Sequence, residues 1–243
     1  MHILKTMMLT ASLAVSACAS AQRDPAAALM SGIACEAVSE DMPIFMWLNV
    51  QSVEAGNSIE IYALTSEYPG SYNQLEPACI GDIQLSAEGI ATISRDEAGT
   101  PTLTVEPALT GSADLTVSAS YNGTEIMEGR ISAYNSADLP LVGLWRQDRE
   151  ACPGNALEEL LFRANGTFAA TWTPFEVYND YWGNYRFDPA TGELSLEVTG
   201  SNYLPEDLRS GRVRLEGDVL QLDTASFGQN RAGVVCEGLL ARG

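Results

Sequence analysis

Short runs of alternating apolar and polar residues, separated by Gly, Pro, Asn or Asp, recur along most of this chain of 243 residues. From Ile59 to Ala63, for example, apolar side chains alternate with Glu60 and Tyr62. A period of two places one face of an extended strand in a core and the other face in solvent. Helical periodicity is almost absent, and turn residues punctuate the runs as they do in sandwiches and barrels. The pattern therefore predicts an all-β protein.

The candidate strands of the first half lie in residues 32–135, which we interpret as one β-sandwich domain. Its seven candidates are Ile44–Val50, Ser58–Leu64, Ile80–Leu85, Ile90–Arg95, Thr102–Glu106, Ala113–Tyr121 and Thr124–Tyr134. We interpret residues 136–140, from Ser136 to Pro140, as the linker between this domain and the next.

Residues 141–243 form the second predicted domain. Its eight candidate strands are Leu141–Gln147, Leu157–Arg163, Thr167–Thr173, Tyr181–Phe187, Glu193–Val198, Arg212–Leu215, Val219–Asp223 and Val234–Ala241. Short loops that contain Gly, Asn, Asp or Pro, which favour hairpin turns, join consecutive candidate strands. No long crossover lies between these strands. Eight strands connected in this way favour a meander that closes into an antiparallel barrel.

The N-terminus predicts export from a bacterial cell, with residues 1–21 as the signal peptide. A basic start precedes an apolar run of about a dozen residues, which is too short to cross a bilayer. Val15-Ser16-Ala17-Cys18 resembles a lipobox, which implies that Cys18 is lipidated and that residues 22–31 form a tether. Ala19-Ser20-Ala21 offers an alternative site for ordinary signal peptidase. We expect an outer-membrane lipoprotein facing the periplasm, and otherwise a periplasmic or secreted protein.

Five cysteines are present, and Cys18 is either lipidated or removed. The remaining Cys35, Cys79, Cys152 and Cys236 predict a disulfide framework, for which three connectivities are possible. If the barrel closes, its first and last strands are neighbours; Cys152 lies just after the first and Cys236 inside the last, so the two can be bridged. Cys35 then pairs with Cys79 in the first domain. A metal site is not expected, because these cysteines are far apart in the sequence and no histidine accompanies them.

The charged residues exclude several classes of function. The only histidine and the only lysine, His2 and Lys5, leave with the signal peptide, so the mature chain carries 12 arginines against 32 acidic residues, a formal charge of −20. Such a surface repels nucleic acid and anionic lipid, so membrane attachment is expected only through the lipid anchor. Without histidine, lysine or a free thiol, triad, Schiff-base and thiolate chemistry are impossible. We expect no enzyme activity and no cofactor.

Two resemblances to known families bear on the fold. Gly143-Leu144-Trp145 resembles the Gly-x-Trp element of lipocalins and related calycin barrels, in which the tryptophan closes one end beneath an arginine from the chain's end. The resemblance implies Trp145 as the plug and Arg242 as its cation–π partner. The string from Tyr181 to Asp188 also looks like small lipocalin-like domains of bacterial envelope proteins. The first domain resembles bacterial immunoglobulin-like sandwiches in strand count and turn spacing.

A cluster of aromatic residues is the predicted ligand site. Its six members are Trp172, Phe175, Tyr178, Tyr181, Trp182 and Tyr185. We expect them around the open end of the barrel, where inward-facing members of the set Ala169, Ala170, Gly183 and Ser195 would leave room for a small apolar ligand. Core filling by the same rings remains an alternative.

The predicted function is that of a non-catalytic envelope lipoprotein whose lipocalin-like barrel binds a small apolar ligand or a protein partner. One alternative is an envelope inhibitor of a lysozyme or protease, since an acidic surface suits a basic target. A second alternative is a carboxylate-dependent glycoside hydrolase, for which Glu176 and Asp180 are the candidates because they lie in the aromatic stretch.

Overall fold

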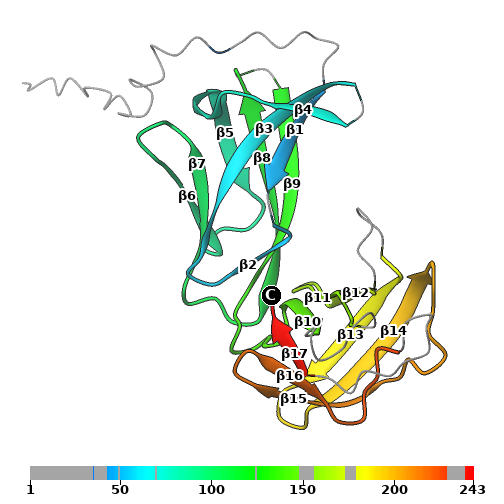
Figure 1. Ribbon diagram of the computed structural model, residues 1–243. Helices are drawn as coiled ribbons and strands as arrows, with labels where there is room; N and C mark the ends of the chain where they lie inside the picture. Colours follow the sequence, from blue (N-terminus) through cyan, green and yellow to red (C-terminus); the bar gives the residue numbers. More distant parts are fainter. Residues whose placement is uncertain are drawn as a thin grey trace, which may run out of the picture.

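The computed structural model describes Cys35 and residues 43–48, 50–68, 70–123, 125–147, 156–172, 179–228 and 239–243. These residues form seventeen β-strands and one short 3₁₀ helix (Figure 1). The prediction of an all-β protein is confirmed. No helix within these ranges is long and apolar enough to cross a membrane.

The strands of the first half form two sheets that face each other. Their bounds are β1 Ile44–Leu48, β2 Ser52–Glu54, β3 Ser58–Tyr68, β4 Ser71–Gln74, β5 Ile80–Leu85, β6 Ala91–Arg95, β7 Pro101–Val105, β8 Ser112–Tyr121 and β9 Glu125–Tyr134, with the 3₁₀ helix η1 at Pro77–Cys79. One sheet has the order β1-β3-β7-β6, with β4 on β3, and the other has the order β2-β9-β8-β5. Buried side chains from both sheets, such as Ile61, Leu103, Val117 and Ile131, form one core. All seven predicted strands are present, and β2 and β4 are additional.

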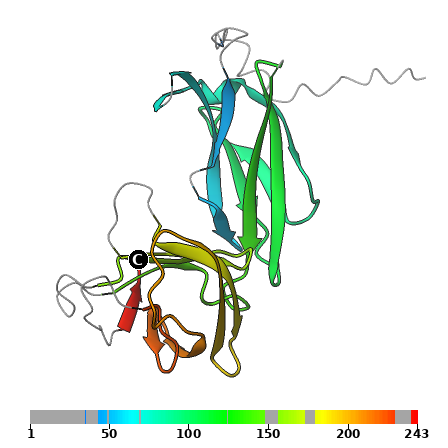
Figure 2. The ribbon, with the colours of Figure 1, turned by 90° about the vertical axis from the view of Figure 1, so that its right-hand side faces the viewer.

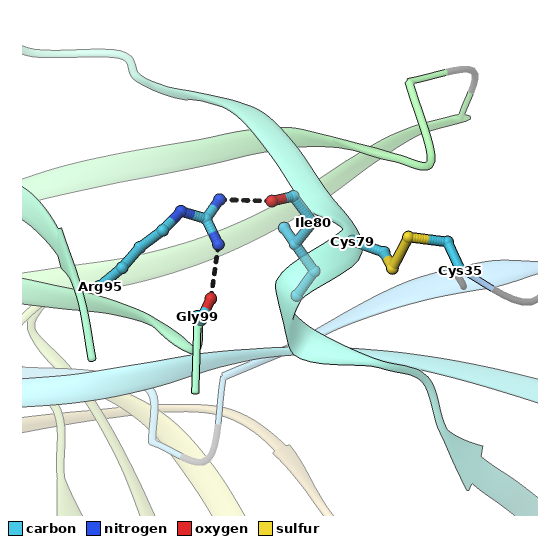
Figure 3. Close-up of a disulfide and its surroundings, with 5 residues drawn as sticks. All are labelled: Cys35, Cys79, Ile80, Arg95 and Gly99. Atoms are coloured by element: carbon cyan, nitrogen blue, oxygen red, sulfur yellow. Dashed lines mark hydrogen bonds between the residues drawn. A yellow bond between two sulfur atoms is a disulfide. The ribbon is translucent and has the colours of Figure 1, made fainter. Parts of the chain in front are cut away.

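The disulfide between Cys35 and Cys79 is present, with a Cα–Cα distance of 5.8 Å. Cys79 is the last residue of η1, and β5 begins at the next residue (Figure 3). The Arg95 side chain donates to the carbonyl oxygens of Ile80 and Gly99, which ties β6 to the start of β5. This predicted pair is confirmed. The predicted Cys152–Cys236 bond and lipidation of Cys18 fall outside the described residues.

The second half forms a closed antiparallel barrel of eight strands in consecutive order (Figures 1 and 2). The strands are β10 Gly143–Gln147, β11 Glu159–Phe162, β12 Thr167–Thr171, β13 Tyr181–Asp188, β14 Glu193–Ser201, β15 Gly211–Glu216, β16 Val219–Leu222 and β17 Leu239–Arg242. β17 lies between β10 and β16 and closes the barrel, with Trp145 opposite Arg242. Each predicted strand of this domain has its counterpart.

The barrel touches the sandwich where β11 ends. The Ala164 amide nitrogen lies 3.3 Å from the Ser52 hydroxyl oxygen of β2. Figure 2 shows the barrel below the sandwich, joined to it by the chain that follows β9.

Candidate functional site

One end of the barrel is closed by Trp145 on β10. Its side chain is fully buried, and its indole nitrogen donates to the Leu141 carbonyl oxygen at 2.8 Å. The guanidinium carbon of Arg242 lies 4.5 Å from the ring centroid. The stacked pair that the Gly-x-Trp resemblance implies is therefore present, whereas membership of the lipocalin family itself stays a prediction.

The Arg242 guanidinium is fixed by polar partners as well as by the ring. Nη1 donates to the Val142 carbonyl oxygen at 2.7 Å, and Nη2 donates to the Pro140 carbonyl oxygen at 2.8 Å. Nε forms an ion pair with the Asp218 carboxylate at 3.2 Å. Charge-assisted hydrogen bonds and cation–π stacking stabilise the same group. These contacts fasten the last strand of the barrel to the first at this end.

The predicted aromatic cluster is divided between the inside and the outside of the barrel. Trp172, Tyr181 and Tyr185 face inward, and each is less than a tenth exposed. Trp182 faces outward and is 38% exposed. Tyr181 and Tyr185 thus lie on one face of β13 and Trp182 on the other. Phe175 and Tyr178 lie outside the described residues, so the cluster as a whole is not tested.

Both inward tyrosines on β13 use their hydroxyl groups within the structure. The Tyr181 hydroxyl donates to the Phe227 carbonyl oxygen, and the Tyr185 hydroxyl donates to the Arg163 carbonyl oxygen at 3.0 Å. Burial raises the pKa of Tyr185 to about 12, with repulsion from Tyr134 as the smaller cause. Burial also raises the pKa of Tyr181 well above its usual value. These groups are neutral hydrogen-bond donors in a packed interior.

Aromatic rings fill much of the barrel interior in the described part of the chain. The Phe162 ring lies 4.7 Å from Tyr185 and 6.1 Å from Phe227 between centroids, and Phe168 lies 6.0 Å from Tyr181. Such edge-to-face pairs pack a core closely.

The small residues that were expected to make room for a ligand do not all face the interior. Ala170 and Gly183 face inward. Ala169 lies opposite the outward-facing Trp182 in the β12–β13 register, and Ser195 is exposed. Only half of the expected set therefore borders the interior.

Asp180, one of the two candidate catalytic carboxylates, has a structural role. Its carboxylate is 7% exposed and accepts a hydrogen bond from the Trp172 backbone nitrogen at 2.8 Å. It therefore holds the end of β12 against the start of β13. Glu176 lies outside the described residues, so the carboxylate pair is not tested. Across the described ranges, no group of three or more His, Cys, Asp or Glu residues is placed to hold a metal ion.

A β-bulge positions the outward-facing Trp182. Trp182 pairs with Gly200, and Gly183 pairs with Val198, so Thr199 is an extra residue on β14. Bulges re-aim neighbouring side chains and are frequent beside functional sites. A Cβ atom on Gly200 would lie within 2.7 Å of three atoms of the Trp182 indole. Glycine at this position therefore lets the ring lie against β14.

An open groove of about 510 Å³ runs along the outer wall of β12 and β13 beside this ring. We call it the Trp182 groove. Besides Trp182, its polar lining consists of amides, hydroxyls and one guanidinium: Arg163, Thr167, Asn179, Asn184, Thr199 and Asn202. The groove thus combines one aromatic surface with several uncharged groups that both donate and accept hydrogen bonds.

Hydrogen bonds hold several of these polar side chains in place. The Asn202 amide donates to the Asn179 carbonyl oxygen at 2.8 Å, and the Asn179 side chain lies 3.3 Å from the Thr171 hydroxyl. The Asn184 amide donates to the Glu197 carboxylate at 3.3 Å. The amide carbonyl oxygens of Asn184 and Asn202 can also accept hydrogen bonds. A preformed polar surface of this kind loses less entropy when it binds a ligand.

Arg163 is the charged residue of the groove. Its Nε is buried without a hydrogen-bond partner, and its guanidinium forms no ion pair within the described ranges. Burial lowers the pKa of Arg163, but a guanidinium stays protonated at neutral pH. A buried donor without a partner is unusual in a native protein and calls for an explanation.

The sequence indicated Trp182, Ala169 and Gly183 among the residues of this groove but none of its polar side chains. The polar side chains come from three strands and three loops, and only the folded barrel brings them together. Gly200 near the end of a predicted strand was an available signal, because an isolated glycine in a strand marks a bulge or a close approach.

Comparison with known proteins gives no family. No protein-family model matches the chain, and no curated protein matches its sequence. Among solved structures it is similar to FdeC, described as a broadly conserved Escherichia coli adhesin that elicits protection against urinary tract infections. The two are 17% identical with a TM-score of 0.25, and the match covers 86% of this chain and 65% of the adhesin chain. A similarity at this level does not establish a shared fold or function.

Proposed function

We propose that this protein is an exported, non-catalytic binding protein of the bacterial cell envelope, and that its barrel binds a small ligand in the Trp182 groove. The observation that carries the proposal is the exposed Trp182 ring, which lies against Gly200 in a groove with a polar lining. Binding sites combine apolar or aromatic surface with a few well-placed polar groups. The groove has this composition and a volume of about 510 Å³.

The absence of catalysis is supported by the residue inventory. The mature chain has neither histidine nor lysine. The Asp180 carboxylate is occupied by a backbone hydrogen bond. The groove offers amides, hydroxyls and a guanidinium, which bind and orient a ligand but are poor proton-transfer groups at neutral pH.

The four tryptophans allow a direct test of the ligand site. Trp47, Trp145, Trp172 and Trp182 each give one indole N–H signal in a ¹⁵N-labelled protein, and Trp-to-Phe variants assign the four signals. A library of monosaccharides, short fatty acids and amino-acid amides serves as the probe. We expect ligands that bind to shift the Trp182 signal and to leave Trp145 and Trp47 unchanged. Ligands that shift only Trp145 and Trp172 would place the site inside the barrel and contradict the proposal.

Envelope attachment is tested separately by the mass of the mature N-terminus. Processing at Cys18 predicts a diacylglyceryl-modified cysteine as the first residue. An unmodified Gln22 start would contradict the lipoprotein and leave export intact.

Exposed aromatic residues on the sandwich favour a second candidate function, binding of a protein partner. Phe45, Trp47 and Tyr72 on β1 and β4 are 44%, 51% and 62% exposed, and the Phe45 and Tyr72 ring centroids lie 6.4 Å apart. Contiguous exposed apolar surface marks interaction sites. Inhibition of a lysozyme or protease that is lost in Trp47→Ala and kept in Trp182→Ala would favour this function.

A further inference from the structure

We infer that the ligand of the Trp182 groove is a saccharide that carries a carboxylate, with a sugar ring against Trp182 and the carboxylate on Arg163. The inference rests on the proposed function, because it names the chemical class of ligand for the same site.

The aromatic part of the groove suits a sugar ring. The Trp182 ring lies against Gly200 on one side and keeps 38% of its side-chain surface exposed. A pyranose has an apolar face of C–H groups that covers an indole, and its hydroxyls remain at the edge of the ring. An apolar ligand such as an acyl chain would instead leave the surrounding amides without partners, which costs free energy for each buried group.

The uncharged polar residues around Trp182 match the hydroxyls of a saccharide. Asparagine side chains both donate and accept, as sugar hydroxyls do. Asn184 lies two residues from Trp182 on β13, on the same outer face and about 7 Å along the strand. Asn202 and Thr199 lie on the β14 side of the ring. Hydrogen-bonding groups therefore lie on both sides of the aromatic surface.

Arg163 adds the requirement for a negative charge. A guanidinium presents a planar fork of donors that fits a carboxylate with two parallel hydrogen bonds. The four ion pairs found within the described ranges use Arg146, Arg212, Arg214 and Arg242. Within the described part of the chain, Arg163 has no such partner. A ligand carboxylate would supply the missing partner.

The position of Arg163 fits a ligand that extends along the groove. Its backbone nitrogen donates to the Thr167 carbonyl oxygen, and Thr167 pairs with Asn184. Trp182 pairs with Ala169, two residues farther along β12. The Arg163 side chain and the Trp182 ring both line the groove, with β12 between the strands that carry or precede them. A saccharide that carries its carboxylate on the stacked ring or on the next sugar unit can contact both residues that line the groove.

The test uses the mature protein and a panel of uronic-acid and sialic-acid oligosaccharides, each beside its methyl ester. The ester keeps every hydroxyl and removes only the charge. For the acids that bind, isothermal titration calorimetry should give an affinity about tenfold higher than for the matching ester. Arg163→Gln should reduce the acid to the affinity of the ester and leave the ester unchanged. Trp182→Ala should weaken both by about tenfold or more.

Two further variants control for the possibility that a substitution changes the affinity by disturbing the fold. Arg186→Gln removes a positive charge from the exposed outer face of β13 at a residue that does not line the Trp182 groove, and it should leave the acid preference intact. Asn184→Asp adds a negative charge at an exposed groove position and should weaken the acids more than the esters.

Equal affinity for acid and ester, or a preference that survives Arg163→Gln, would overturn the carboxylate assignment. Failure of every saccharide to bind would overturn the inference as a whole. In both cases the proposed function still stands if other probes shift the Trp182 indole signal, so the two failures are distinguishable.

Discussion

The Arg242 guanidinium lies 4.5 Å from the centroid of the Trp145 ring, although the two residues belong to the last and the first strand of the barrel. Gly143 is the residue that permits this approach. Its φ of +137° is rare for other amino acids, and a Cβ atom would lie 2.7 Å from Arg242 Nη1. The three residues therefore form one unit that fastens the seam of the barrel.

Gly143→Ala should destabilise the barrel through both backbone strain and overlap with Arg242. We expect a loss of about 3 kcal/mol in the free energy of unfolding, measured by urea denaturation. Gly217→Ala is the matched control, because Gly217 has a φ of +61° and open space around it. The control should lose only about 1 kcal/mol from backbone strain. Equal losses at the two positions would contradict a contact between position 143 and Arg242.

Trp145→Ala should be the more damaging change at the same end. The side chain is fully buried and donates a hydrogen bond to Leu141. Deleting a large buried ring leaves a cavity and costs about 3 to 5 kcal/mol. Trp47→Ala, at a position that is 51% exposed, should change the stability by less than about 1 kcal/mol. A loss below about 1 kcal/mol for Trp145→Ala would show that this residue is not a core plug.

The strands were largely predictable because a period of two is a strong local signal. On β13 the period of two places Tyr181 and Gly183 on one face and Trp182 on the other, as in the structure, but it did not indicate which face is inward. β2 and β4 were missed. β2 has only three residues, and it pairs in parallel with β9, which is far away in the sequence. A local sequence pattern therefore does not predict this strand.

The Trp182 groove could not be predicted from the sequence, because it depends on how two strands pair. The bulge at Trp182 and Gly183 depends on where Thr199 falls on the partner strand, and register is a property of the pair. Similarly, alternation required one of Ala169 and Ala170 to face inward but did not identify which. The cation–π pair, in contrast, was predicted from the Gly-x-Trp resemblance and the position of Arg242.

Removal of the Cys35–Cys79 bond should destabilise the sandwich mainly by raising the conformational entropy of the unfolded chain. The bond closes a loop with a sequence separation of 44, which corresponds to about 4 kcal/mol in the chain-entropy model. Cys35→Ala/Cys79→Ala should therefore unfold at a markedly lower urea concentration than the oxidised protein. Adding a reductant to the natural protein should lower the midpoint at least as far, because it also reduces the predicted Cys152–Cys236 bond. A change below about 1 kcal/mol would contradict a stabilising role.

The second predicted bond, between Cys152 and Cys236, is tested by peptide mass mapping without reduction. Because Cys35 and Cys79 are already paired, we expect one further linked pair of peptides, containing Cys152 and Cys236. Free thiols at both positions, detected by alkylation before digestion, would contradict the prediction.

The buried tyrosines should make the barrel sensitive to alkaline pH. Tyr185 retains its proton up to a pKa of about 12 in the folded protein because it is buried, whereas an unfolded tyrosine loses it near pH 10. Between these values the unfolded state binds fewer protons, so stability falls as pH rises, by about 1.4 kcal/mol per pH unit for one tyrosine. Tyr181, whose pKa is also raised, steepens the same fall.

Urea denaturation at several pH values between 9 and 12 should show constant stability below about pH 10 and a loss above it. Tyr185→Phe should reduce the slope above pH 10, while Tyr72→Phe, at a position that is 62% exposed, should leave it unchanged. A slope that is the same in the natural protein and in Tyr185→Phe would show that this hydroxyl is not protected by burial.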